Sequence, residues 1–331
     1  FFHVPTTLNA MEPNPMRFSL PREREGERKG PDKHLHKAPI QHPVHRPLVI
    51  LGCNGGGIKG YCSVRVLEEL EKAVGTPDNP APVYTFIHGS IGDSTGAIIT
   101  AAITANPTTT TPSNFLTGSI PHQLAQLYLQ QGQYIFSSHP RSRFLDWLQE
   151  SCLGSCYLSL KNLFWPKYNG EHLREIFDSS FGSLSLADTR PQPAEKGEST
   201  RQIEMSLLTC DMSTGTTFEF NSTKVRQGKQ PNFLLKEAVY AACAQATTFP
   251  TAHIHPVVSP DQHPDISQVF DLIDAGPLDN PMVQALQMGL RQLRERGIDP
   301  MAELLTHYES YKSGRMPPLL RIVHVSTGHH T

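Results

Sequence analysis

The sequence predicts an α/β fold in three layers, with a mainly parallel central sheet sandwiched between helices. Between residues 48 and 103, two short apolar segments each lead through a glycine-rich turn into a helical pattern. This alternation is expected of parallel strands that are joined by covering helices. The chain has 331 residues, 38% of them hydrophobic, which is enough apolar surface for one large domain or two small ones.

The composition changes near residue 47 and predicts two regions. Residues 1–46 show no hydrophobic periodicity and are rich in Pro, His and charged side chains. Such a segment buries too little apolar surface to offset the entropy of ordering, so we predict a flexible N-terminal extension. Residues 47–331 carry all the periodic segments, and we predict that they form one domain.

The first predicted strand–turn–helix unit begins directly after this boundary. The apolar run 48–51 predicts a strand buried on both faces. A glycine cluster follows over 55–60, and the apolar residues from Val64 to Val74 then recur at helical spacing. Gly75 is a suitable residue to end this helix.

The second predicted unit repeats the pattern. The β-branched and aromatic run 83–87 predicts a strand, residues 89–96 a glycine-rich turn, and the Ala- and Ile-rich residues 97–103 a helix. The rest of the chain predicts a polar loop over 187–201, helices over 121–150, 171–179, 234–246 and 281–296, and strands over 202–211, 216–221, 269–273 and 319–325.

Charge, hydropathy and cysteine spacing exclude several classes of protein. The 29 basic and 31 acidic residues give a net charge of −2, which argues against binding to nucleic acid through bulk positive charge. The sequence contains no run of 18 or more apolar residues, so it predicts no membrane-spanning helix. Six cysteines without a C-x-x-C pair predict buried thiols rather than a disulfide scaffold or a zinc site of that spacing.

A glycine–serine motif suggests a nucleophile. Gly92-x-Ser94-x-Gly96 lies between a predicted strand and a predicted helix, as in a nucleophile elbow. The serine of such an elbow sits on a tight turn, and glycines two residues to either side allow other chain segments to pack against that turn. The N-terminus of the following helix directs its N–H groups and positive dipole end toward a developing oxyanion.

The glycine cluster has three interpretations. A P-loop fails because Lys59 precedes Gly60 and no Ser or Thr follows in register. A dinucleotide fingerprint is matched by Gly55, Gly57 and Gly60, but the acidic residue that should end the next strand is missing. The third interpretation, which we favour, is an oxyanion hole built from successive N–H groups, with Lys59 adding positive charge.

Two residues compete for the role of general base. The order Ser…Asp…His nominates His324, although His324 lies inside an apolar strand pattern where a core or edge role explains it equally well. Asp274 ends a predicted strand and precedes a turn, and α/β sites assemble at the carboxyl ends of parallel strands. Asn280 and Pro281 then form a helix start that fixes the far side of this loop.

Taken together, these motifs resemble the three signature blocks of patatin-like phospholipases, in the order of that family. The resemblance spans about residues 47–328, and the blocks are Asn54–Gly60, Gly92–Gly96 and Asp274–Gly276. It implies that Ser94 is the nucleophile and Asp274 the base of a Ser–Asp dyad that uses no histidine. It also implies that the oxyanion loop consists of Gly55, Gly56 and Gly57, with Lys59 beside them.

Three positions depart from the family pattern. Asn54 stands where Asp is usual, and Lys59 stands where Arg is usual, which keeps the charge but loses the guanidinium fork. Ala275 follows Asp274 where the family has glycine. A methyl group at that position restricts φ, so a slightly shifted carboxylate is expected.

The resemblance implies an acyl hydrolase of phospholipids that needs no metal and no cofactor and acts at a membrane surface. The expected location is cytoplasmic and peripheral to a membrane, with a secreted effector and a protein or small-molecule activator as open alternatives. The aromatic segment from Phe115 to Trp147 is a candidate lid, although core packing explains it better. The competing hypotheses are a Ser–Asp–His esterase and a lipid- or nucleotide-sensing module without turnover.

Overall fold

The computed structural model describes residues 47–76, 78–107, 119–135, 166–192, 201–257, 269–276, 280–312 and 318–327. The predicted extension over 1–46, the second half of the predicted helix 121–150 and residues 193–200 of the predicted polar loop lie outside these ranges.

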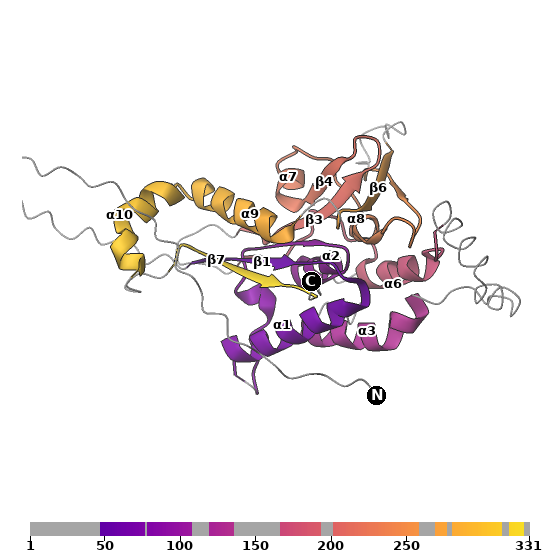
Figure 1. Cartoon of the computed structure of the whole chain (residues 1–331), viewed down its shortest axis with the longest axis horizontal. Coiled ribbons are helices and arrows are strands. Elements are labelled where there is room, and N and C mark those ends of the chain that lie inside the picture. Colours follow the sequence, from indigo (N-terminus) through magenta and orange to yellow (C-terminus); the bar gives the residue numbers. More distant parts are fainter. Residues whose placement is uncertain are drawn as a thin grey trace, which may run out of the picture. The chain divides into compact units, whose positions relative to one another are not determined.

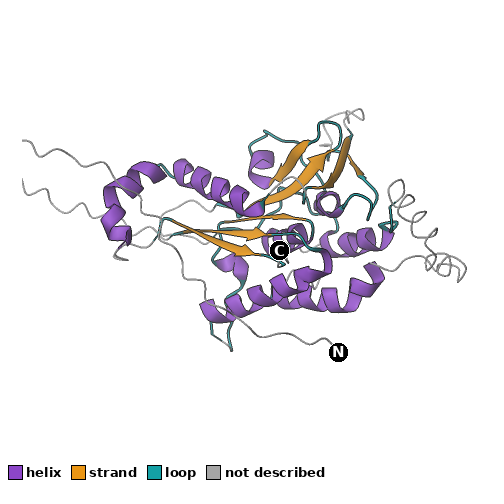
Figure 2. Ribbon diagram, in the orientation of Figure 1, coloured by secondary structure: helices purple, strands orange, loops and turns teal. Residues whose placement is uncertain are grey.

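The predicted α/β architecture is confirmed, with a central sheet whose core strands run parallel (Figure 2). Four neighbouring strands pair in parallel in the order β7-β1-β2-β3. The remaining strands are antiparallel additions, because β4 and β6 both pair with β3, and β5 pairs with β6. The strands are β1 (Leu48–Cys53), β2 (Gly89–Asp93), β3 (Glu204–Asp211), β4 (Thr216–Asn221), β5 (Ala252–Ile254), β6 (Phe270–Asp274) and β7 (Leu320–Val325).

Helices cover both faces of this sheet, which gives the three layers (Figure 1). Helices α1, α2, α3, α6 and α8 pack on one face, and α9 packs on β1, β2 and β7 from the other. The helices are η1 (Gly57–Lys59), α1 (Gly60–Val74), η2 (Val83–Thr85), α2 (Thr95–Thr104), α3 (Ile120–Ile135), α6 (Glu171–Phe181), α7 (Ser222–Arg226), α8 (Leu235–Cys243), α9 (Pro281–Glu295) and α10 (Pro300–Lys312). None of these described helices is long and apolar enough to cross a bilayer.

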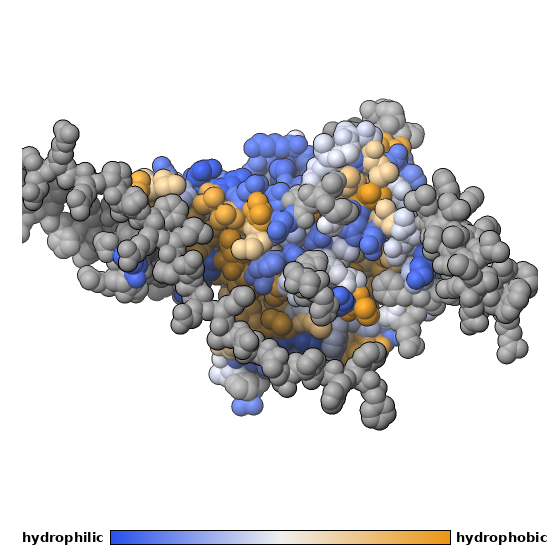
Figure 3. Space-filling model, viewed as in Figure 1, coloured by the Kyte–Doolittle hydropathy of each residue, from blue (hydrophilic) through white to orange (hydrophobic). Residues whose placement is uncertain are grey.

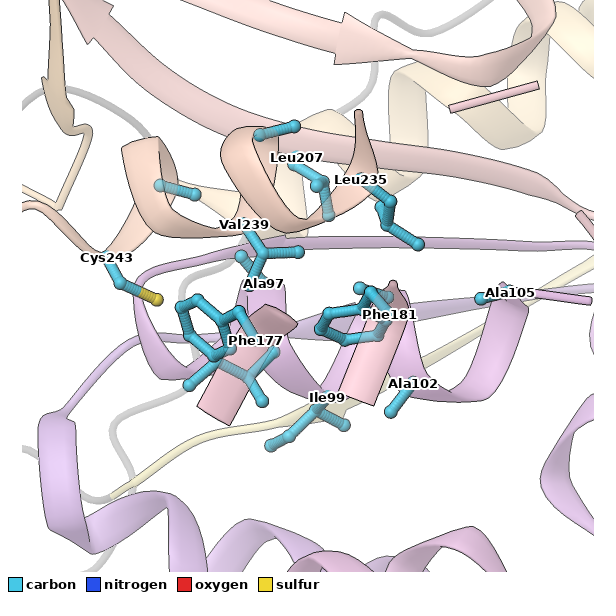
Figure 4. Packing of buried hydrophobic residues seen from close by; sticks show 14 of the residues in the cluster. Ala97, Ile99, Ala102, Ala105, Phe177, Phe181, Leu207, Leu235, Val239 and Cys243 are labelled. Atoms are coloured by element: carbon cyan, nitrogen blue, oxygen red, sulfur yellow. The ribbon is translucent and has the colours of Figure 1, made fainter. Parts of the chain in front are cut away.

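The buried apolar residues form two cores, and helix α2 lies at the centre of the larger one. All ten of its residues are buried, and Figure 4 shows Ala97 and Ile99 of α2 close to Phe177 of α6 and Val239 of α8. A helix surrounded on all sides needs small or compact apolar side chains, which explains its Ala- and Ile-rich sequence. The smaller core lies beneath α9 and consists of Ile50, Ile91, Leu208, Ala275, Ala285 and Met288.

The predicted strand over 83–87 is wrong. Val83–Thr85 forms the short helix η2, and the second strand is Gly89–Asp93, which was predicted as a glycine turn. All five residues of this strand are buried, and there is little room for side chains beside it. A Cβ on Gly89 would lie 2.5 Å from Met288 Sδ, so helix packing rather than β-propensity decides this strand.

The other predicted elements that fall within the described ranges are confirmed, with ends that shift by a few residues. Besides η2, four described elements were not predicted: the short helices η1 and α7, the three-residue strand β5, and α10, which follows α9 after a short turn. Asn280 caps α9 by accepting a hydrogen bond from the Met282 N–H at 3.0 Å, and Pro281 is the first helical residue, as predicted.

Candidate active site

The candidate site lies where the carboxyl ends of β1, β2 and β6 meet. Asp93 ends β2 and is paired with Leu208 of β3, while Asp274 ends β6 and is paired with Thr209, the next residue of β3. The two strand ends are therefore side by side. One detail differs from the expectation, because Asp274 ends a strand that runs antiparallel to β3 rather than a parallel one.

Ser94 has the backbone geometry of a nucleophile elbow. Its φ of 49° and ψ of −126° lie in a region that L-residues rarely adopt. The turn is fixed from α8, since the Ser94 N–H donates to the Ala242 carbonyl at 3.0 Å and the Cys243 thiol donates to the Ser94 carbonyl at 3.2 Å. Tertiary hydrogen bonds thus hold the strained residue in place.

The two flanking glycines are required by close packing. A Cβ on Gly92 would lie 2.3 Å from the Gly96 carbonyl oxygen, and a Cβ on Gly96 would lie 2.0 Å from the Cys53 carbonyl oxygen. A side chain at Gly92 would push the start of α2 away from β2, and one at Gly96 would push it away from β1. The spacing Gly92-x-Ser94-x-Gly96 is therefore a steric requirement of the turn, as the motif predicts.

Asp274 lies near Ser94. The Ser94 hydroxyl is close enough to the Asp274 carboxyl to lower its pKa through hydrogen bonding, and the Gly276 N–H donates to Asp274 Oδ1 at 2.8 Å. The residue is 5% exposed, and this burial raises the pKa of its carboxyl group, while the hydrogen bonds from Ser94 and Gly276 act in the opposite direction. A raised pKa makes the carboxylate a stronger base for the serine proton.

Ala275 does not disturb this arrangement. Its methyl group is buried in the core beneath α9, and its φ is not positive. Asp274 still receives both hydrogen bonds. The replacement of the family's glycine is thus accommodated by packing.

The glycine loop lies directly against the nucleophile. A Cβ on Gly55 would lie 2.7 Å from Ser94 Cβ, so only glycine fits there. The Gly55 N–H donates to Asp93 Oδ1 at 2.8 Å, and the Gly55 carbonyl accepts a hydrogen bond from Thr327 Oγ1 at 2.8 Å. Both backbone polar groups of Gly55 are therefore engaged by the protein.

The N–H groups of the next two glycines are not used within the described structure. Gly56 and Gly57 have φ values of 153° and 58° and are exposed. Within the described part of the chain, no group accepts a hydrogen bond from either N–H. Helix α2 begins at Thr95, directly after Ser94, so the N–H groups of its first turn lie at the elbow. Of the three predicted loop glycines, Gly55 is the one whose N–H is already occupied.

Lys59 and His324 lie at the margin of the site. Lys59 ends η1 with an exposed side chain that forms no hydrogen bond or ion pair with the described residues. His324 is exposed on the edge strand β7, and its Nε2 donates to Asn54 Oδ1 at 2.8 Å. Its described partner is thus Asn54 rather than Ser94 or Asp274.

Sequence reasoning missed two residues that contact the glycine loop. Asp93 occupies an unspecified position of the serine motif, and Thr327 lies in the segment after β7. A third contact fixes the start of α2: the hydroxyls of Thr95 and Tyr128 form a hydrogen bond, with Tyr128 buried in α3. The sequence signal that could have identified Asp93 was its position directly before the nucleophile.

Metal ligands are not clustered in the described ranges, where no group of three or more His, Cys, Asp or Glu side chains is arranged to hold an ion. The residues that meet at Ser94 are instead a carboxylate, hydroxyls and backbone amides. This set of groups fits nucleophilic acyl transfer.

The chain is distantly similar to potato (Solanum tuberosum) patatins. It is 23% identical to Patatin group J-1 over 252 residues, which are 75% of this chain and 54% of that protein. It is 24% identical to Patatin group A-2 over 205 residues, which are 61% of this chain and 43% of that protein. The chain therefore spans about half the length of the curated relatives that it matches. No family model matches it.

Proposed function

We propose that the chain is a patatin-like acyl hydrolase that cleaves fatty-acyl esters of membrane phospholipids with a Ser94–Asp274 dyad. The observation that carries this proposal is the proximity of a strained elbow serine to a buried carboxylate, whose pKa the serine hydroxyl lowers. A nucleophile and its base in direct contact, beside exposed backbone donors, is the arrangement that acyl transfer requires. The likeness to patatins supports the same conclusion.

The first half of the reaction forms an acyl-enzyme. Asp274 accepts the Ser94 proton as the serine oxygen attacks the ester carbonyl, and the N–H groups of Gly56 and Gly57 stabilise the oxyanion. The tetrahedral intermediate collapses, the ester C–O bond breaks, and the leaving alkoxide takes the proton back from Asp274. The products of this step are a lysophospholipid and an acyl group on Ser94.

The second half regenerates the enzyme. Asp274 accepts a proton from a water molecule that attacks the acyl-serine carbonyl, and the same N–H groups stabilise the second oxyanion. Collapse breaks the bond to Ser94 Oγ, which recovers its proton from Asp274 and releases the fatty acid. No step needs His324, because one carboxylate both accepts and returns the proton.

A hydrophobic rim around the glycine loop supports action at a membrane surface, which makes the protein peripheral to the bilayer. We define this rim as Ile58 and Leu129 on the side of α1 and α3, and Met282 and Val283 at the start of α9. All four side chains are at least 49% exposed. Figure 3 shows hydrophobic side chains gathered between α9 and β7, whereas the surface over α7 is hydrophilic.

The test is fatty-acid release from mixed phospholipid vesicles in the presence of a chelator. We expect release by wild type, and none above background by Ser94→Ala or Asp274→Asn. His324→Ala, which removes the hydrogen bond to Asn54 Oδ1, should keep most of the activity. Loss of activity in His324→Ala together with an active Asp274→Asn would instead establish a Ser–Asp–His esterase.

An inactive wild type would require a second arm. Cell lysate that has been depleted of its own lipase activity would be added to wild type and to Ser94→Ala. Release that depends on Ser94 would identify an enzyme with an activator. Saturable lipid binding without release under both conditions would contradict the proposed hydrolase and favour a sensing module.

A further inference from the structure

Asp93 is a buried carboxylate that the proposed reaction leaves unused. It is 5% exposed and ends β2 directly before the nucleophile, with its main chain fixed by pairing with Leu208 of β3. Burying a carboxylate beside a site where negative charge develops is unfavourable. Such a residue is expected to have a compensating role.

The contacts of Asp93 point to the glycine loop. Its Oδ1 accepts the Gly55 N–H at 2.8 Å, and a Cβ on Gly55 would lie 2.9 Å from its Oδ2. Thr327 holds the next peptide group, since its Oγ1 donates to the Gly55 carbonyl at 2.8 Å. Gly55 is thus clamped between the strand that carries the nucleophile and the segment that follows β7.

The clamp determines which amides face the substrate. Because Gly55 gives its N–H to Asp93, the donors that remain on the loop are those of Gly56 and Gly57. The Gly56 N–H shares a peptide group with the Gly55 carbonyl, so its direction depends on how Gly55 is held, and Gly55 has neither a side chain nor a helix to fix it. A hydrogen bond from an N–H to a carboxylate is stronger than one to a neutral acceptor, so Asp93 is well suited to hold the N–H side of Gly55 while Thr327 holds its carbonyl side.

We propose that Asp93 is a positioning residue that anchors the oxyanion loop through the Gly55 N–H, with Thr327 as the second half of the clamp. The proposal rests on the proposed function, because the loop matters only if Ser94 attacks an acyl group. Asp93 acts through Gly55 and does not accept the serine proton, which is the role of Asp274.

The test compares Asp93→Ala with Asp93→Asn on a soluble ester, p-nitrophenyl butyrate. Asparagine keeps an oxygen that accepts the Gly55 N–H, whereas alanine removes the acceptor. We expect Asp93→Ala to lower kcat about 30-fold with KM nearly unchanged, somewhat less than the loss of a whole oxyanion donor. Asp93→Asn should restore kcat to within about threefold of wild type, and Thr327→Val should lower it in the same way as Asp93→Ala.

A matched control lies on the neighbouring strand. Asp211 ends β3 and also accepts a backbone N–H at 2.8 Å, that of Ser213, in a turn away from the glycine loop. Asp211→Ala should leave kcat unchanged. If Asp93→Asn is as inactive as Asp93→Ala, the carboxylate charge rather than the hydrogen bond is needed, and the positioning role is overturned.

Amide hydrogen exchange at Gly55 separates this inference from the proposed function. NMR of glycine-labelled protein should show a protected Gly55 amide in wild type and in Asp93→Asn, and faster exchange in Asp93→Ala. Equal protection in all three would contradict the clamp whether or not the protein is an esterase. Lost protection in Asp93→Ala without loss of kcat would show a clamp that catalysis does not need, and would equally overturn the proposal.

A wild type that hydrolyses no ester would be examined with a fluorophosphonate, which reports on Ser94 without substrate turnover. Slower modification of Asp93→Ala than of Asp93→Asn would uphold the positioning role while the proposed lipid activity failed. Equal rates in the two variants would contradict it.

Discussion

Ser94 is held in a backbone conformation that costs free energy, about 1–3 kcal/mol for a residue with a side chain in such a region. The hydrogen bonds from α8 offset this cost. The strain is useful because it presents the hydroxyl to Asp274 at the top of the sheet.

Glycine at this position should therefore relieve the strain. We expect Ser94→Gly to be more stable than Ser94→Ala by about 1 kcal/mol, or about 2 °C in Tm, although both are inactive. Thermal unfolding followed by circular dichroism measures the difference. A lower Tm for the glycine variant would mean that the elbow is not strained.

Asp274 links activity and stability to pH. Burial raises its pKa above the ordinary value of 3.8, so activity should increase with pH through a midpoint above that value as the carboxylate ionises. Between 3.8 and the raised pKa the folded chain binds the proton more tightly than the unfolded chain, so stability falls as pH rises through this window. Once Asp274 is ionised, its burial therefore destabilises the fold.

Replacement by asparagine should remove this cost. We expect Asp274→Asn to be inactive but more stable than wild type at pH 7, with the difference vanishing below about pH 4. Asp211→Asn is the control of opposite sign, because hydrogen bonds from Ser213 lower the pKa of Asp211. Denaturant titrations at pH 4 and 7 measure both. A less stable Asp274→Asn at pH 7 would contradict the assigned pKa direction.

Among the elements, β1 and β2 are joined by a histidine that must remain neutral. His88 precedes β2, and its Nδ1 accepts the Val49 N–H of β1 at 3.1 Å. Burial, together with the positive charge of Arg296, lowers the pKa of His88 from 6.5 to about 4. The unfolded chain therefore binds more protons than the folded chain between these values, and stability falls as pH falls through this window.

The gap between a pKa of 6.5 and one of about 4 corresponds to about 3 kcal/mol. Between pH 7 and pH 4 the free energy of unfolding should fall further in wild type than in His88→Gln, by up to about 3 kcal/mol. His122→Gln, which alters an exposed histidine on α3, should behave as wild type. Urea titrations across this pH range measure the free energy of unfolding. Parallel pH curves for wild type and His88→Gln would contradict the lowered pKa of His88.

The elements also show where sequence patterns succeed and where they fail. Strand β1, helix α9 and the cap at Asn280 follow from apolar runs and capping chemistry, which are local properties. Sequence patterns could not show that the strand lies at Gly89–Asp93 and that Val83–Thr85 forms the short helix η2. Val83–Thr85 has high β-propensity, whereas Gly89–Asp93 has little. The strand has its place because its glycines admit Met288 and Gly96, which come from other elements.

The site shows the same division. Ser94 and Asp274 could be proposed because each sits in a short motif that describes its own turn. Asp93 and Thr327 could not, because their role is a contact between segments 38 and 272 residues apart from Gly55. The register of β3, which sets Asp93 beside Asp274, is likewise a tertiary fact.

For the whole molecule, the hydrophobic rim predicts a difference between soluble and membrane substrates. We expect Ile58→Ser to lower hydrolysis of phospholipid vesicles about fivefold, because the partial burial of one such side chain in lipid contributes about 1 kcal/mol. Hydrolysis of a soluble short-chain ester should not change. Val74→Ser is the control, since Val74 is 51% exposed at the far end of α1, about 20 Å away. Equal losses on both substrates would indicate damage to the glycine loop rather than to a membrane contact.

The most direct test of the whole account is to trap the acyl group. Protein is mixed with phosphatidylcholine vesicles, quenched in acid within the first turnovers, digested, and analysed by mass spectrometry. The account predicts a fatty-acyl adduct on the peptide that contains Ser94, its absence in Ser94→Ala, and its accumulation only when Asp274 is present. Release of fatty acid with no adduct on Ser94, or with an adduct on another residue, would contradict the Ser94–Asp274 mechanism.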